Sequence, residues 1–75
     1  MNARPVKHSL TLNGHRTSVS LEAPFWDAFC DAAKQDGKSI NELASEIDTA
    51  RGTDSGLASA IRVYILNRVQ AASSP

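Results

Sequence analysis

The sequence predicts a small, mostly helical domain that begins with a β-hairpin and associates with a second copy of itself. Two patterns predict the elements. Residues 6–21 alternate apolar and polar side chains around an Asn-Gly pair, and residues 24–70 repeat apolar side chains every three or four positions. Length predicts the association, because a chain of 75 residues is only marginally stable alone. One cysteine allows no internal disulfide and no Cys/His cluster has zinc spacing, which leaves oligomerisation.

The hairpin is predicted from the agreement between its turn and its hydrophobic pattern. Asn13-Gly14 is the strongest short-range signal for a two-residue type I′ turn. That turn pairs residues 6–12 with residues 15–21 and brings the apolar side chains of both strands to one face. His8 and His15 fall on this inner face, where we expect them to be packed. The opposite face is polar: Lys7, Ser9, Thr11, Arg16, Ser18 and Ser20.

Three helices are predicted after the hairpin. The first covers residues 24–35, with Pro24 suited to its first turn and Gly37 to a left-handed end. The second follows a capping-box pattern over residues 39–42 and runs to about residue 50. The third, residues 57–70, is apolar over so much of its circumference that we expect a second buried side, supplied by another subunit.

The net charge is zero, but the charges are unevenly distributed. Residues 1–21 carry three basic side chains and no acid, whereas all eight acids lie in residues 22–54. Neutrality argues against a chain that simply coats nucleic acid, and the asymmetry orients the hairpin toward a polyanion. The single cysteine is typical of a reduced, cytoplasmic protein, which is what we expect; no apolar run approaches a membrane span and no signal peptide is visible. We predict one domain over residues 6–70, with disordered ends at residues 1–5 and 71–75.

Several short motifs follow one another along the chain, and their order and spacing are more informative than any one of them. They are the alternating strand 17–21, the turn 37–41 into a helix, the run 14–22 with Phe25-Trp26, and Ser59-Ala60-Ile61-Arg62. This order resembles a poorly characterised bacterial branch of the ribbon-helix-helix family, which includes the Arc and MetJ repressors. In that family two chains pair their strands antiparallel into a ribbon that enters the major groove. The resemblance covers about residues 16–51, and it implies an intertwined homodimer that binds double-stranded DNA.

The resemblance also implies roles for individual residues. Arg16, Ser18 and Ser20 would face the bases, because arginine pairs with guanine O6 and N7 and serine bonds to several base edges. A phosphate would lie at the N-terminus of the second helix, held by N–H groups and the helix dipole. The implied phosphate contacts are Lys38, Ser39, Ile40 and Lys7. The implied dimer interface is Val19, Leu21, Ile61, Tyr64, Ile65 and Leu66.

The predicted hairpin conflicts with a simple two-stranded ribbon. Two strands about 4.8 Å apart fit a major groove about 12 Å wide, but a dimer of hairpins presents four strands. Either strand 6–12 swings away, or DNA is approached differently, or the protein does not read a groove.

We therefore predict a dimeric, sequence-specific DNA-binding protein, a transcriptional regulator. The alternative is a dimeric protein-interaction module that does not read DNA, favoured by the neutral charge and the hairpin. An antitoxin is disfavoured, because only residues 71–75 follow the last predicted helix. An enzyme is not expected, since no third residue is placed to orient His8 or His15 and the chain is too short for a deep cleft. Cys30 lies in an apolar stripe and is expected to be a buried thiol. Neither a metal nor a cofactor is predicted.

Overall fold

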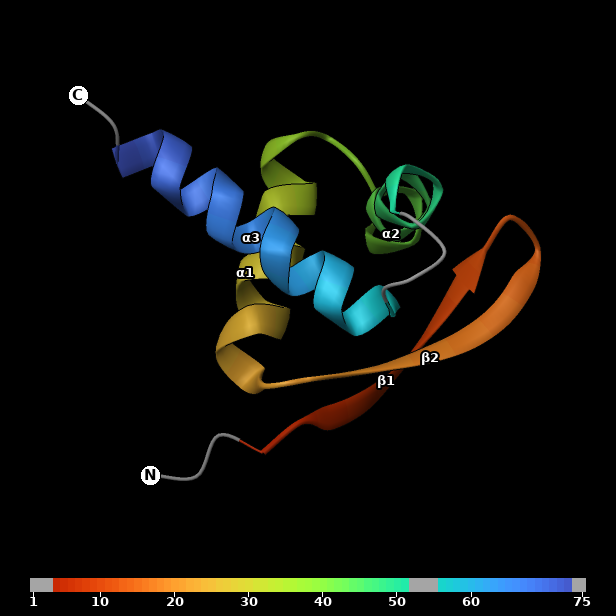
Figure 1. Ribbon diagram of the computed structural model, residues 1–75. Coiled ribbons are helices and arrows are strands. Elements are labelled where there is room, and N and C mark those ends of the chain that lie inside the picture. Colours follow the sequence, from red (N-terminus) through yellow and green to blue (C-terminus); the bar gives the residue numbers. More distant parts are fainter. Residues whose placement is uncertain (1–3, 52–55, 74–75) are drawn as a thin grey trace.

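An N-terminal hairpin lies along one side of three helices in the computed structural model, which describes residues 4–51 and 56–73 (Figure 1). The second helix contacts the first strand, and the third helix contacts the second strand and both other helices, so these two helices tie the hairpin to the helical layer. The elements are β1 (Val6–Leu12), β2 (His15–Leu21), α1 (Ala23–Gln35), α2 (Ile40–Ala50) and α3 (Leu57–Ser73). The predicted fold class, a hairpin followed by three helices, is confirmed.

The hairpin has the predicted register. Strands β1 and β2 are antiparallel, with Leu12 paired to His15 and Val6 paired to Leu21. Asn13 and Gly14 in the turn have positive φ angles of 53° and 83°, as a type I′ turn requires. The local turn chemistry and the alternation of side chains therefore specify the same pairing.

The inner face of the hairpin is only partly covered by the helices. Four of its apolar side chains have at most 8% of their surface exposed. Thr17 and His15 lie on the same face but are exposed, and Val6 is 50% exposed. The expectation that His15 is packed was wrong. The four buried side chains are Leu10, Leu12, Val19 and Leu21.

The helices begin and end close to the predicted positions. Helix α1 starts one residue early, at Ala23, and keeps Pro24 in its first turn. Gly37 follows it with a φ of 68°, the left-handed conformation that glycine adopts without strain. Helix α2 has the predicted capping box, in which the Ser39 hydroxyl accepts from the Glu42 N–H and the Glu42 carboxylate accepts from the Ser39 N–H.

Helix α3 is longer than predicted and carries apolar side chains on two sides. It runs through Ser73, so residues 71–73 are helical and not a disordered tail; alanines at 71 and 72 favour the helix. The expected disorder of residues 1–3, 74 and 75 concerns positions outside the described residues. Ile61 and Ile65 pack into the core. The other side of α3 exposes Val63, Leu66 and Val69, each by slightly more than half.

The core forms where the three helices meet the inner face of the hairpin. Phe29 of α1 and Leu43 of α2 lie at its centre and are almost completely buried. Trp26 packs against it at the edge, and its ring is tilted against Phe29 with centroids 5.6 Å apart. The helices therefore serve as a scaffold with the hairpin on one side.

In residues 4–51 and 56–73 no helix is long and apolar enough to span a bilayer.

Candidate nucleic-acid interface

The outer face of the hairpin presents six polar side chains to solvent. In the observed register Lys7 lies beside Ser20, and Thr11 lies beside Arg16. The middle row consists of Ser9 and Ser18. All six side chains are exposed, because the apolar side chains that alternate with them point to the helices. The predicted base-facing residues Arg16, Ser18 and Ser20 thus lie together on one accessible face.

A hydrogen bond and a ring stack join β1 to the helices, in addition to its buried leucines. The Thr11 backbone N–H donates to Asn41 Oδ1 of α2 at 3.0 Å, which joins the outer edge of β1 to that helix. The half-buried His8 ring stacks on Trp26 of α1, with the centroids 3.7 Å apart and the planes 3° apart. Sequence patterns gave no signal for either contact, because both join elements that are far apart in the chain. The hairpin is therefore a fixed part of the fold.

Basic side chains on the helices are mostly engaged by carboxylates. Arg62 Nη2 lies 2.8 Å from Glu22, Arg68 Nη2 lies 3.0 Å from Asp36, and Arg51 and Lys38 are each 2.6 Å from an acid. The Arg68 hydrogen bond lowers the pKa of Asp36, and this carboxyl stays ionised at neutral pH. The basic side chains that form no ion pair within residues 4–51 and 56–73 are Arg4, Lys7, Arg16 and Lys34.

The N-terminus of α2 is less open to a phosphate than the resemblance implies. Glu42 already accepts from the Ser39 N–H, and this bond together with the Ser39 hydroxyl lowers the pKa of the Glu42 carboxyl. A carboxylate therefore occupies part of the anion-binding end of the helix. The hydrogen bond to Glu46 raises the pKa of Lys38 and neutralises its charge locally. Ile40 is half-buried against the core.

The outer edge of β2 is paired with no other strand of the described residues. Arg62 of α3 approaches this edge at one end, where its Nη2 is 3.5 Å from the Ser20 carbonyl oxygen. Beneath the other end is a hollow of about 350 Å³ lined partly by His15 and Thr17. An unpaired edge above a partly uncovered face is the arrangement that a second strand and its helices would complete.

The residues predicted at the dimer interface fall into two groups. Val19, Leu21, Ile61 and Ile65 are at most 5% exposed, so packing within the single chain already accounts for their apolar character. Tyr64 is half-buried, and its hydroxyl lies 3.1 Å from Arg68 Nη1. Leu66 is 52% exposed and is the one member of the set that could gain much burial from a partner.

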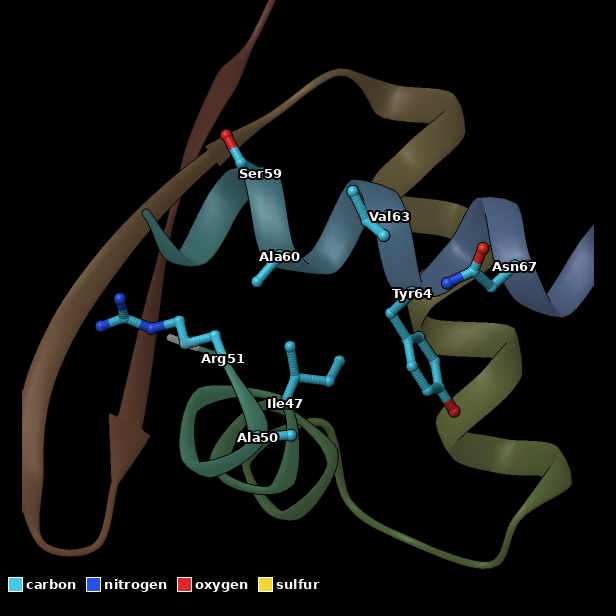
Figure 2. Close-up of a pocket in the computed structure, with 8 residues that line it drawn as sticks. All are labelled: Ile47, Ala50, Arg51, Ser59, Ala60, Val63, Tyr64 and Asn67. Carbon is cyan, nitrogen blue, oxygen red and sulfur yellow. The ribbon is translucent and has the colours of Figure 1, made fainter. Parts of the chain in front are cut away.

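A second hollow, of about 390 Å³, lies between α2 and α3 (Figure 2). Ile47 and Ala50 form its floor on α2, while Val63 and Tyr64 border it on α3 (Figure 2). Arg51 lies at one end, with its guanidinium near Asp48. The lining is mainly apolar and holds no arrangement of acid, base and nucleophile, so it suits packing of a side chain better than chemistry.

The described residues offer little for catalysis or metal binding. No three His, Cys, Asp or Glu side chains in residues 4–51 and 56–73 lie close enough together to hold a metal ion. Cys30 is half-buried, less than the buried thiol that was predicted. Burial, with the nearby carboxylates Asp27 and Asp31, raises the pKa of this thiol, which therefore stays protonated and weakly nucleophilic at neutral pH.

Comparison with known families agrees with this architecture. The sequence model of the ribbon-helix-helix domain matches residues 5–69, which includes the hairpin and nearly all of the helices. The chain belongs to the ribbon-helix-helix domain family. This family is generally one of DNA-binding transcription regulators and has a non-enzymatic fold. Comparisons with curated proteins and with solved structures return no significant match.

Proposed function

We propose that this ribbon-helix-helix protein is a dimeric, sequence-specific DNA-binding regulator of transcription in the bacterial cytoplasm. One observation carries the proposal: the outer face of the hairpin combines four hydroxyls with two basic side chains that form no ion pair within residues 4–51 and 56–73, and this face contains no acid. Such a surface attracts phosphates and can donate hydrogen bonds to base edges. The fixed attachment of the hairpin supports this role, because a reading surface must be held in a defined position.

The bases are proposed to be read by β2. Arg16 is suited to a bidentate contact with guanine, and Ser18 and Ser20 to single hydrogen bonds with several bases. Arg16→Ala should therefore weaken specific binding by about 1–3 kcal/mol and relax discrimination at one base position. Phosphate contacts are proposed for Lys7 and, more weakly, for the N-terminus of α2. At this terminus, a phosphate contact by Lys38, Ser39 and Ile40 requires the Lys38 ammonium to leave Glu46 and bind the phosphate instead.

Dimerisation is proposed through the outer edge of β2, supported by the absence of a strand paired to this edge among the described residues and by the exposed Thr17 beneath it. The exposed apolar side chains of α3, including Leu66, are available to extend the contact. The unfolding midpoint of a dimer rises with protein concentration. A midpoint independent of concentration, with monomer mass by light scattering at micromolar concentration, would contradict this part of the proposal.

The proposed function is tested by a binding titration. Fluorescently labelled fragments pooled from bacterial genomic DNA are titrated with the protein at about 50 and 200 mM salt, and polarisation is measured. A protein with several phosphate contacts loses affinity steeply between these concentrations. The matched control is the triple variant Arg16→Ala, Ser18→Ala, Ser20→Ala, which keeps the core and should lose selection of particular fragments.

The alternative function is a dimeric protein-interaction module that uses the fold without reading DNA. It is favoured by the net charge of zero and by the mainly apolar hollow between α2 and α3. Absence of DNA binding at low salt would favour this alternative. A triple variant that binds the same fragments as the unmodified protein would show that the hairpin face is not the reader.

A further inference from the structure

We propose that β1 is a second part of the DNA-binding surface, in which Lys7, Ser9 and Thr11 contact the phosphates that flank the groove read by β2. The inference rests on the proposed DNA-binding function. It adds a strand that a two-stranded ribbon lacks, and it assigns to this strand a different ligand, the phosphodiester backbone.

The first step is that β1 remains beside β2 when DNA binds. Leu10 and Leu12 of β1 are 2% and 8% exposed, and both would be exposed to water if the strand swung away. The same movement would break the bond from the Thr11 N–H to Asn41 and separate His8 from Trp26. Burying one leucine side chain is worth about 1.5–3 kcal/mol, so release of the strand is strongly disfavoured.

The second step is the width of the sheet that a dimer presents. If the outer edges of two β2 strands pair antiparallel, all seven residues overlap when Ser18, the middle residue of His15–Leu21, meets Ser18 of the second copy. The strand order is then β1-β2-β2-β1. With a spacing of about 4.8 Å the two β1 strands are about 14 Å apart, and the major groove is about 12 Å wide. The inner strands therefore lie over the groove and the outer strands lie over its phosphate edges.

The third step is the match between each strand and its ligand. Arg16 on the inner strand has the planar fork that recognises guanine, whereas Lys7 on the outer strand is a compact charge that suits a phosphate oxygen. In the register above, Lys7 lies beside Ser20 of the same copy, and Ser20 lies beside Arg16 of the second copy. The hydroxyls of Ser9 and Thr11 on β1 are donors of the kind that contact phosphates. Residues 4–21 contain no acid to oppose this contact.

The fourth step is that β1 takes over a role for which the N-terminus of α2 is poorly suited. Lys38 is paired with Glu46 at 2.6 Å, and Glu42 binds the Ser39 N–H. Lys7 forms no ion pair in the part of the chain that the structure describes. The side chain that is available for a phosphate is therefore on the strand.

The test compares Lys7→Ala with Lys34→Ala, which removes an exposed lysine of α1 that forms no ion pair with the described residues. The probe is a labelled duplex selected by the unmodified protein from a random library, together with a scrambled duplex of equal length. Polarisation is measured at about 50, 100 and 200 mM salt. Circular dichroism and the unfolding midpoint establish that each variant is folded.

We expect Lys7→Ala to weaken binding to both duplexes by the same factor. Loss of two phosphate contacts per dimer should reduce the slope of log affinity against log salt concentration by about 2. The factor by which Lys7→Ala binds more weakly than the unmodified protein should therefore be about tenfold smaller at 200 mM than at 50 mM salt. Lys7→Arg should restore most of the slope, and Lys34→Ala should change neither property.

A result in which Lys7→Ala binds like Lys34→Ala, while Arg16→Ala still relaxes discrimination, would overturn the role of β1 and leave the proposed function standing. A change of base preference in Lys7→Ala would also overturn it, because a phosphate contact carries no sequence information. Failure of the unmodified protein to bind any duplex at low salt would overturn both proposals.

Discussion

The basic side chains of the hairpin and those of the helical side differ in whether they form ion pairs with acidic side chains. On the helices and the turn between α1 and α2, Arg62 is held by Glu22, Arg68 by Asp36 and Lys38 by Glu46, so most positive charge there is cancelled within the molecule. On the hairpin, Lys7 and Arg16 form no ion pair within residues 4–51 and 56–73 and are exposed on the outer face. A net charge of zero therefore conceals a surface that is locally positive. For a chain this small, the location of unpaired charge is more informative about a polyanionic partner than the net charge is.

The same two regions differ in what they contribute to stability. The helical side and the inner face of the hairpin supply the buried apolar surface, and the outer face supplies none. Substitutions should therefore separate cleanly into those that unfold the protein and those that change only binding. The predictions below test this separation, beginning with the largest effect.

Truncating the core should have the largest effect on stability. Phe29 is completely buried between the helices, and Phe29→Ala removes its contacts with Trp26 and leaves a cavity. We expect the free energy of unfolding to fall by about 3–5 kcal/mol, measured by urea denaturation. Ser18→Ala on the outer face is the control and should remain within about 0.5 kcal/mol of the unmodified protein. Equal losses in the two variants would mean that the outer face also carries stability.

Straining the hairpin turn should have an intermediate effect. Gly14 has a φ of 83° and no atom within 4 Å of an added Cβ, so Gly14→Ala introduces backbone strain without a clash. The expected loss is about 1–2 kcal/mol. Gly56→Ala is the control, because no positive φ opposes an added Cβ there; it precedes α3 and should lose only the preference for glycine over alanine at a helix N-cap. A harmless Gly14→Ala would indicate that β1 is loosely attached, which would also weaken the case for its contact with DNA.

Acid should weaken the helical side through its carboxylates. Hydrogen bonds lower the pKa of Glu22, first from its own backbone N–H and then from Arg62, and a hydrogen bond from Arg68 lowers that of Asp36. A group with a depressed folded-state pKa stabilises above its ordinary pKa and loses this contribution as pH falls through the folded value. The unfolding midpoint should therefore decrease below about pH 4.5. Asp36→Asn should flatten this decrease; an unchanged profile would show that the Arg68 pair does not contribute.

Much of this fold could be predicted from the sequence because its strongest signals are local. Asn13-Gly14, the alternation on either side of it, and the Ser39-to-Glu42 cap each act within a few residues, and all three were correct. The family resemblance was likewise confirmed by the match over residues 5–69. The end of α3 was placed three residues short, because helix boundaries depend on weak propensities.

The candidate site was less predictable, because it depends on contacts between distant residues. Alternation alone placed Arg16, Ser18 and Ser20 on the exposed face. No pattern in the sequence indicated that Lys38 would meet Glu46, or that His8 would lie on Trp26 and fix β1. Nor could the pattern separate apolar side chains buried within one chain from those left exposed, which is why the predicted interface mixed core residues with Leu66.

The most direct test of the account is an amide chemical-shift titration of the ¹⁵N-labelled protein with a selected duplex at low salt. If the hairpin face binds DNA, the largest shifts should fall on residues of that face and remain small on the exposed side of α3, at Val63 and Leu66. The residues expected to shift are Lys7, Ser9, Thr11, Arg16, Ser18 and Ser20. Shifts confined to α3 and the adjoining hollow, with the hairpin unchanged, would contradict the central claim that DNA is bound by the outer face of the hairpin.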